Sequence, residues 1–428
     1  MSIKRIEVKN FKSFKELKID LGKFNVVIGA NASGKSNFVH IFKFLRDAKN
    51  SGLDNAISMQ GGVEYLRNMN IGASEPLSIK VVSDQELGFG QQTKEGLIGI
   101  KTYETTYEFT LRFNKRGSGF NIVRDKLSQK CKFFRLERKG KKIEEKEILG
   151  EGEILISRSN GRIKIDLNIS PKALLRKEDI FPPFLREEKL PKHTLLLETP
   201  YFFISPLGYV FSETSIYDFD PKLPKKATPI TGKAELEEDG SNLSIILKNI
   251  TGNREKKRKL FNLVKDLLPF VEDLDVEKFA DKSLLFKLKE SYFKTQYLPA
   301  SLISDGTINM TALIVALYFE KKPFIIIEEP ERNIHPSLIS KVVEMMKDAS
   351  KTQKKQIVVT THNPEFVKYA GLENILLVSR NEEGFSTVYR PADKEEVRTF
   401  LKNNIGIEEL YIQTVSYTHL TLPTKRIV

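Results

Sequence analysis

The sequence has very little cysteine and no long apolar run. Its 428 residues include one cysteine, Cys131, which excludes an internal disulfide and any cysteine-based zinc site within one chain. No apolar stretch is long enough to cross a membrane, and the N-terminal residues alternate like a strand instead of forming a signal-peptide core. Internal repeats and low-complexity tracts are also absent. These absences predict a globular, cytoplasmic protein with no membrane partner.

Positive charge is in excess and unevenly spread. The chain has 69 Lys and Arg against 56 Asp and Glu, a formal net charge of +13. Between Arg112 and Glu147 thirteen basic residues stand against five acidic ones, with Phe120, Phe133 and Phe134 among them. A second basic cluster comprises Arg254, Lys256, Lys257, Arg258 and Lys259. Two interpretations stay open: a surface for a phosphate backbone such as that of DNA, or a solvated, lysine-rich hairpin.

The strongest motif is GANASGKS, from Gly29 to Ser36. It fits the phosphate-binding pattern G-x-x-x-x-G-K-[ST], and the pattern requires a strand before it and a helix after it. An apolar run at 24–28 and helical spacing at 37–47 predict both elements. Glycines let backbone N–H groups face an anion, and the helix N-terminus adds positive charge. The motif therefore predicts Lys35 on the β- and γ-phosphates of ATP and the Ser36 hydroxyl on Mg²⁺.

Periodicity divides the chain into segments. Residues 76–170 alternate with period two between glycine-containing turns, which predicts an antiparallel β subdomain with basic hairpins. Residues 171–295 are interpreted as an irregular and helical insertion. In residues 296–414 apolar strands alternate with helices, which predicts a parallel sheet shared with residues 1–75, and 40% hydrophobic residues suffice for such a core. Residues 415–428 break the composition and are expected to be a non-native or disordered tail.

Two carboxylates follow an apolar strand of the last segment. Glu328 and Glu329 come directly after the run 323–327, at the sheet edge where a nucleotide enzyme needs an acidic ligand near Mg²⁺ and a second carboxylate for water. We assign Glu328 to the metal and Glu329 to general base. Asp is the commoner first residue of such a pair, and an acidic turn that caps the next segment is the structural alternative.

A histidine and a polar turn complete the candidate site. His362 follows an apolar strand at 356–361, where it could reach the γ-phosphate or the attacking water; a strand-end histidine is also often a structural hydrogen-bonding residue. The turn Ser304-Asp305-Gly306 precedes an apolar helix. Its hydroxyl and the free N–H groups of the helix N-terminus offer a second contact with an anion, or an ordinary helix cap.

Four motifs, in this order, resemble a known family. GANASGKS, LISDGT, FIIIEEPERNIHP and VTTHNPEF are similar to the Walker A, signature, Walker B with D-loop, and His-switch motifs of ABC-type ATPases of the SMC/RecF class. More narrowly, they resemble stand-alone prokaryotic AAA-domain predicted ATPases of the OLD/AbiEii-like type. The resemblance implies an α/β P-loop NTPase of the ABC-ATPase type, with a parallel core sheet, an antiparallel β subdomain and a helical insertion.

The resemblance also implies roles for individual residues. Glu328 would contact the metal, Glu329 would be the base and His362 would lie at the γ-phosphate. Contact with phosphate and Mg²⁺ is implied for Gly29, Asn31, Gly34, Lys35 and Ser36. Contact with the nucleotide of a second subunit is implied for Ser304, Asp305 and Gly306. The opening NFKSF turn lies near the nucleotide in relatives, which makes Lys12 a further candidate. The glutamine switch stays open among Gln60, Gln91 and Gln92.

The implied function is a Mg²⁺-dependent ATPase. Its homodimer would sandwich two ATP molecules and act on or sense nucleic acid, as in repair or phage defence. The alternative is an ATP-dependent switch that regulates a partner protein or toxin without direct DNA action. A transporter subunit and a small-molecule P-loop kinase fit less well, because the signature contains SDGT and a long insertion separates Lys35 from Ser304. The stretch after His362 is too short for the nuclease domain of some OLD relatives.

Overall fold

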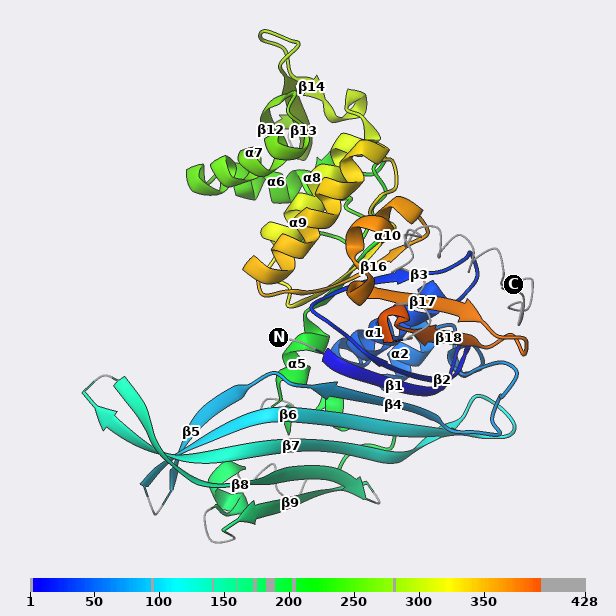
Figure 1. Cartoon of the computed structure of the whole chain (residues 1–428), viewed down its shortest axis with the longest axis vertical. Coiled ribbons are helices and arrows are strands. Elements are labelled where there is room, and N and C mark those ends of the chain that lie inside the picture. Colours follow the sequence, from blue (N-terminus) through cyan, green and yellow to red (C-terminus); the bar gives the residue numbers. More distant parts are fainter. Residues whose placement is uncertain are drawn as a thin grey trace, which may run out of the picture. The chain divides into compact units, whose positions relative to one another are not determined.

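The computed structural model describes residues 3–93, 96–140, 142–159, 161–171, 175–181, 189–201, 205–279 and 282–393. These residues form two compact units (Figure 1). Unit 1 contains the described residues of 1–22, 36–214 and 379–389, and unit 2 contains those of 23–35, 215–378 and 390–428. The expected tail at 415–428 lies outside the described residues. Within the described part, no helix is both long and apolar enough to span a membrane.

Unit 1 is built on an eight-stranded antiparallel sheet (Figure 1). The strand order is β2-β1-β4-β6-β7-β8-β9, and β5 also pairs with β6. Alternate side chains are buried, as period two predicts; β7 buries Leu127, Cys131 and Phe133. The strands are β1 (Ile3–Phe11), β2 (Phe14–Asp20), β4 (Leu77–Ser83), β5 (Leu87–Thr93), β6 (Gly96–Phe113), β7 (Phe120–Lys139), β8 (Lys142–Ser159) and β9 (Arg162–Ser170).

The helix that follows the phosphate loop, α1 (Lys35–Ser51), packs against this sheet. The ring of Phe44 lies 6.0 Å from that of Phe11 on β1 and 6.4 Å from that of Phe109 on β6. Aromatic contacts therefore hold the helix on two strands. The shorter elements of unit 1 are α2 (Leu53–Met59), α3 (Val63–Leu66), α4 (Lys177–Ile180), η2 (Leu196–Glu198), α5 (Pro206–Ser212) and β18 (Ser386–Tyr389), which lies against β2.

Unit 2 is built on parallel strands. Their order is β15 (Phe324–Glu328), β16 (Gln356–Thr361), β3 (Phe24–Ile28) and β17 (Ile375–Arg380), with β10 (Thr214–Tyr217) beside β15. Nearly every residue of β15, β16 and β3 is buried, which explains their unbroken apolar sequences. The packing helices are α8 (Asp305–Tyr318), α9 (Ile339–Thr352) and α10 (Pro364–Ala370).

A smaller antiparallel sheet completes unit 2 (Figure 1). Its strand order is β11-β13-β12, and β14 also pairs with β13. Two helices, α6 (Leu243–Thr251) and α7 (Arg254–Leu267), pack against it, and α7 also contacts α8. The strands are β11 (Thr228–Pro229), β12 (Val271–Phe279), β13 (Ser283–Glu290) and β14 (Leu298–Pro299). The 3-10 helices are η4 (Ala300–Leu302), η5 (Pro336–Leu338), η6 (Leu372–Asn374) and η7 (Pro391–Asp393).

The expected fold class is confirmed: an α/β chain with a parallel core, an antiparallel β region and helices inserted between the motifs. Two local features add detail to this outline. Residues 50–62 contain α2, because Leu53, Ala56 and Ile57 bury their side chains in unit 1. Residues 241–268 contain two helices, because the chain breaks at Gly252 and the Asn253 side chain caps α7.

Candidate functional site

Three neighbouring strands of unit 2 end at the same level. In the register of β15 with β16, Glu328 is opposite Thr360; in that of β16 with β3, Thr361 is opposite Ile28. Because these strands are parallel, the residues that follow them lie along one edge of the sheet. This edge brings together the phosphate loop, the carboxylate pair and the histidine, which come from three separate parts of the sequence.

The phosphate loop has a backbone that only small residues allow. A Cβ atom at Gly29 would lie 2.3 Å from the Val378 carbonyl oxygen, so that position requires glycine. Gly34 and Ala32 have φ angles of 119° and 60°, in the left-handed region that favours glycine. These conformations turn the chain tightly from β3 into α1, the arrangement that forms anion-binding concavities at helix N-termini.

The Lys35 side chain contacts the backbone of the phosphate loop. Its Nζ atom donates hydrogen bonds to the carbonyl oxygens of Gly29 at 2.8 Å and Ala30 at 3.0 Å. Burial lowers the pKa of Lys35, and the negative charges of Glu329 and Glu331 raise it in part. Phosphate oxygens would replace the carbonyls as stronger, charge-assisted acceptors. Asn31 is exposed in the same loop.

The residues at this edge fit a Mg²⁺ ion held together with phosphate oxygens. Among the described residues no group of three or more His, Cys, Asp or Glu could hold a metal by itself. Mg²⁺ is commonly held by one or two carboxylates plus substrate phosphates, so a carboxylate and a hydroxyl suffice. Within unit 2 the carboxylate is that of Glu328, at the end of β15. The hydroxyl is that of Ser36, which directly follows Lys35 in the chain and is exposed.

Glu329 is held by two side chains. Its Oε1 atom lies 3.0 Å from Nδ1 of His362, and its Oε2 atom accepts a hydrogen bond from Arg332 at 3.1 Å. Arg332 also donates to Asp218 at 2.9 Å. Burial raises the pKa of Glu329, but the hydrogen bonds from Arg332 and His362 outweigh it and lower the pKa below its usual value. The carboxylate is therefore ionised at neutral pH and held in place.

The backbone at Glu329 is also unusual. Its φ angle is 44°, in the left-handed region, and its N–H donates to the Thr360 carbonyl at 2.9 Å. Strained non-glycine residues of this kind occur mainly at functional sites. The turn directs the Glu329 carboxylate toward His362, which follows the neighbouring strand β16.

The sequence reasoning did not identify Glu331 and Arg332 as site residues. Glu331 is buried, its Oε1 atom accepts a hydrogen bond from the Thr361 hydroxyl, and its Oε2 atom has no partner in the described part of the chain. Burial raises its pKa. The signal was present as a third carboxylate and an arginine in the run EEPER, but sequence alone does not show which of them face the sheet edge.

The Ser304-Asp305-Gly306 turn begins α8. The Ser304 side chain accepts a hydrogen bond from the Thr307 N–H at 3.2 Å and caps the helix, and Asp305 forms an ion pair with Lys225. A Cβ atom at Gly306 would lie 2.5 Å from the Asn333 carbonyl oxygen, so the turn packs tightly against the segment after Glu329. Ser304 itself is exposed.

Lys12 and the three candidate glutamines belong to unit 1. Lys12 has a φ angle of 46°, and its Nζ atom donates to the Tyr65 carbonyl at 3.5 Å. Burial lowers its pKa, and so does the nearby Lys43. Gln91 and Gln92 lie on β5, where Gln92 is exposed. Gln60 is buried at the end of α2 and its Oε1 atom has no partner among the described residues.

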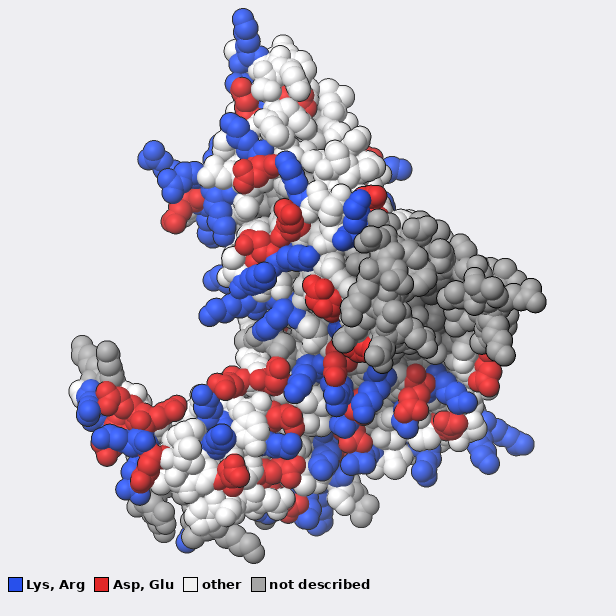
Figure 2. All heavy atoms as spheres, viewed as in Figure 1, with Lys and Arg blue, Asp and Glu red and all other residues white. Residues whose placement is uncertain are grey.

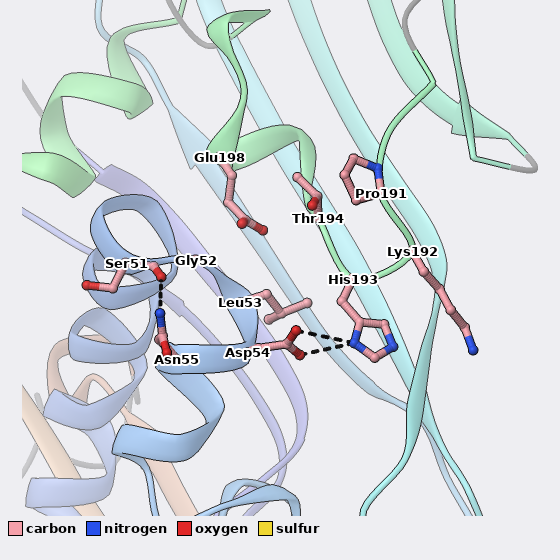
Figure 3. Close-up of a pocket in the computed structure, with 10 residues that line it drawn as sticks. All are labelled: Ser51, Gly52, Leu53, Asp54, Asn55, Pro191, Lys192, His193, Thr194 and Glu198. Carbon is pink, nitrogen blue, oxygen red and sulfur yellow. Dashed lines mark hydrogen bonds and ion pairs between the residues drawn. The ribbon is translucent and has the colours of Figure 1, made fainter.

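Unit 1 also contains a hollow of roughly 420 Å³ that the sequence did not indicate (Figure 3). It lies between the start of α2 and the segment before η2. His193 faces Asp54 across it at 3.1 Å and stacks on Phe120, and Glu198 points into it. Burial raises the pKa of Glu198. The hollow is lined by Ser51, Gly52, Leu53, Asp54, Asn55, Pro191, Lys192, His193, Thr194 and Glu198.

Comparison with known proteins places this geometry in a family. The family model described as "AAA domain, putative AbiEii toxin, Type IV TA system" matches residues 24–368. An "ATP/GTP phosphatase" of Helicobacter pylori is 22% identical over 375 residues, 86% of each chain. The "Chromosome partition protein Smc" of Methanocaldococcus jannaschii is 48% identical over 46 residues, 10% of this chain and 4% of that protein.

A solved structure supports the fold. It is titled "Crystal structure of the SmcHead bound to the C-winged helix domain of ScpA", and it aligns with a TM-score of 0.50 and 15% identity over 91% of this chain and 98% of that one. The fold and the site together define a P-loop ATPase of the ABC type, similar to SMC heads. The chain belongs to the AAA-domain family of the putative AbiEii toxin type.

Proposed function

We propose that this chain hydrolyses ATP to ADP and phosphate in a Mg²⁺-dependent reaction, with Glu329 as the general base. The observation that carries the proposal is the ionised Glu329 carboxylate. It is held by His362 and Arg332 at the edge of the sheet on which the phosphate-loop strand also ends. A positioned base of this kind typically contributes about 10² to 10⁴ in rate.

Each residue of the site has a role in this reaction. Backbone N–H groups from Gly29 to Gly34 and the Lys35 ammonium would bind the phosphates, and Glu328 and Ser36 would hold Mg²⁺, which neutralises phosphate charge. The water oxygen attacks the γ-phosphorus, the bond to the bridging oxygen of ADP breaks, and Glu329 takes the proton of the water. His362 and Arg332 keep that carboxylate oriented. His362 is also our candidate for contact with the γ-phosphate.

We propose that two chains close on ATP. The exposed position of Ser304, whose side chain also caps the start of α8, supports this step because a nucleotide held by another chain could reach it from solvent. Leu302 beside it is 69% exposed, as expected of a surface that a partner covers. Asp305 and Gly306 would join this contact, and Lys12 would approach the nucleotide from the NFKSF turn.

We further propose that the ATP cycle acts on or senses nucleic acid in the cytoplasm. The net charge of +13 supports a polyanionic partner. The one cysteine supports a reducing compartment: Cys131 is buried, and burial raises its pKa to about 11, so it is a poor nucleophile.

The experiment that tests the ATPase is light scattering of Glu329→Gln with and without Mg-ATP. The variant keeps the shape of the side chain and loses the base, so it should bind ATP, hydrolyse it at least about 100-fold more slowly than the natural chain, and accumulate as a dimer. Glu344→Gln, an exposed glutamate of α9, is the matched control and should turn over normally. If the Glu329→Gln protein hydrolyses ATP at the natural rate, Glu329 is not the general base.

A Glu329→Gln protein that binds ATP and stays monomeric would instead show that two chains do not close on ATP. It would favour an ATP-dependent switch that acts through some other protein. Multiple turnovers by the natural chain, measured as phosphate release, separate an enzyme from a single-use switch.

A further inference from the structure

The basic hairpin of unit 1 is partly neutralised by its own sheet. Five cations between Arg112 and Glu147 form ion pairs with carboxylates of the same sheet: Arg124 with Glu108, Lys130 with Glu104, Arg135 with Glu147, Lys139 with Glu144 and Lys146 with Glu137. Lys132 lies over the ring of Tyr103. The hairpin is therefore a ladder of cross-strand charge pairs, and Figure 2 shows acidic and basic side chains interspersed there.

The remaining cations of the hairpin lie at several places along it. Among its described side chains, five form no ion pair: Arg112, Lys115 and Arg116 near the β6–β7 turn, Lys126 on β7, and Arg138 near the other end of β7. A strand of 20 residues is roughly 60 Å long, so the charges at its two ends cannot act as one patch. Lys141 lies outside the described residues, as does the side chain of Lys142.

The α6–α7 basic turn of unit 2 differs from the hairpin because its cations lie close together and have no ion pairs among the described residues. We define this turn by Lys248, Arg254, Lys256 and Arg258. All four side chains are exposed and none has an ion-pair partner in the part of the chain that the structure describes. The neighbouring cations are already engaged: Lys257 pairs with Asp273 at 3.2 Å, and Lys259 lies over the rings of Tyr318 and Phe319. Figure 2 shows lysine and arginine gathered over α7.

The position of these cations is unfavourable for the helix that carries them. Arg254 and Lys256 lie in the first turn of α7, where the helix dipole is positive and acidic residues are preferred. Arg254 and Arg258 are four residues apart and therefore neighbours of like charge on one face. Glu255 is the only acid from 254 to 259. A bound anion would relieve both repulsions.

We propose that the α6–α7 basic turn binds the phosphate backbone of a nucleic-acid duplex. The proposal rests on the nucleic-acid part of the proposed function and gives it a location. Arginine forks match phosphate geometry, and Arg254 and Arg258, four residues apart on one face of α7, suit neighbouring phosphates. A membrane surface fits less well, because Leu260, Val264 and Leu267 of α7 are buried in unit 2. The half-buried Phe261 and Leu263 offer little apolar surface for lipid.

The test compares two triple variants of the full chain that lose the same charge. One is Arg254→Gln with Lys256→Gln and Arg258→Gln; the control is Lys115→Gln with Arg116→Gln and Arg138→Gln. Binding of a fluorescent mixed-sequence DNA duplex is measured at several salt concentrations. The α7 variant should bind about tenfold more weakly or worse, and its slope of log affinity against log salt should be smaller by about 2 to 3. The control should keep most of the natural affinity and slope.

Thermal unfolding gives a second readout. Loss of like charges from the start of α7 should leave the melting temperature unchanged or slightly higher, so lost binding cannot be assigned to misfolding. Equal losses in both variants, or a larger loss in the control, would overturn the proposal, and so would stronger binding to phosphatidylserine vesicles than to DNA. A natural chain that hydrolyses ATP but binds no duplex would overturn this proposal while leaving the ATPase intact.

Discussion

The β7–β8 hairpin of unit 1 and the start of α7 in unit 2 differ in how their charges are balanced. The hairpin pairs many of its charges across neighbouring strands, from Lys130 with Glu104 to Lys139 with Glu144. Unit 2 also has cross-strand pairs, such as Lys287 with Glu277, but Arg254 and Arg258 lie side by side on α7 and neither has an ion-pair partner among the described residues. Exposed pairs contribute little to stability, so the pairing in unit 1 mainly preserves solubility and register.

This difference in charge balance indicates where anionic ligands should bind. A cation that already faces a carboxylate gains little from a phosphate, because the carboxylate must first be displaced. A cation beside other cations gains much more, because the anion also removes a repulsion. Three predictions follow from this comparison, in order of decreasing effect.

The largest effect should come from Lys35→Ala in unit 2. The ammonium would donate charge-assisted hydrogen bonds to two phosphates, each worth about 1.5 to 3 kcal/mol, so we expect ATP affinity to fall by about 100-fold or more. Isothermal titration with ATP measures this loss. Lys321→Ala, an exposed lysine of the same unit, is the matched control. Unchanged affinity of the Lys35→Ala protein would remove its assigned role and weaken the contrast between the units.

The second effect concerns Asp125, a buried acid of unit 1. It accepts hydrogen bonds from the Leu196 N–H and the Tyr107 hydroxyl, and burial raises its pKa to about 7. The folded state therefore holds its proton more tightly than the unfolded state, whose pKa is near 3.9. The resulting stability is fully present below about pH 4 and is lost as pH rises toward 7, by at most roughly 4 kcal/mol.

Hydrogen exchange measures this effect separately in each unit. Protection of β6 and β7 should fall between pH 5 and 7 after correction for the intrinsic exchange rate, roughly the window set by the raised pKa. Asp125→Asn has no proton to lose and should flatten that dependence. A pH dependence that survives in Asp125→Asn would show that another group causes it.

The third effect concerns Lys355, the buried base of unit 2. Its Nζ atom donates to the carbonyl oxygens of Ala316, Leu317 and Glu320 and so caps the end of α8. Lys355→Met leaves these carbonyls without that donor, so we expect a loss of about 2 to 3 kcal/mol of unfolding free energy in urea at pH 7. Lys351→Met, an exposed lysine of α9, should change stability by less than about 0.5 kcal/mol.

The pH dependence at Lys355 should have the opposite sign to that at Asp125. Burial lowers the pKa of Lys355 to about 8, below its ordinary value of 10.5. The unfolded state then binds the proton more tightly, so this group makes the protein more stable as pH rises from about 8 to 10.5. The Lys355→Met protein should lack that rise. If both proteins respond alike, the lysine is not the group that titrates.

Much of the fold could be predicted because its signals are local. The strands β3, β15 and β16 are buried on both faces and therefore have continuous apolar sequences, and β6 to β9 are buried on one face and therefore alternate. The helix α2 could not be predicted, because its polar sequence is helical only through the few side chains that unit 1 buries. Tertiary packing determines that this segment is helical.

Some features of the candidate site could likewise be predicted from the sequence, and others could not. Gly29, Gly34 and Lys35 follow from a spacing that a phosphate requires within one loop, and Glu329 follows from its place at a strand end. The bond of Glu329 to His362 depends on which strand lies beside β15, and the sequence does not state that order.

The sequence by itself determined the motifs, their order and the excess of positive charge, because each depends on residue type and on spacing along the chain. Only the tertiary structure decided which charges are neutralised. The hairpin and α7 are both rich in Lys and Arg, yet one pairs its cations across strands and the other leaves Arg254, Lys256 and Arg258 in solvent. The physical reason is that an ion pair acts over a few ångströms between residues that folding, and not the sequence, makes neighbours.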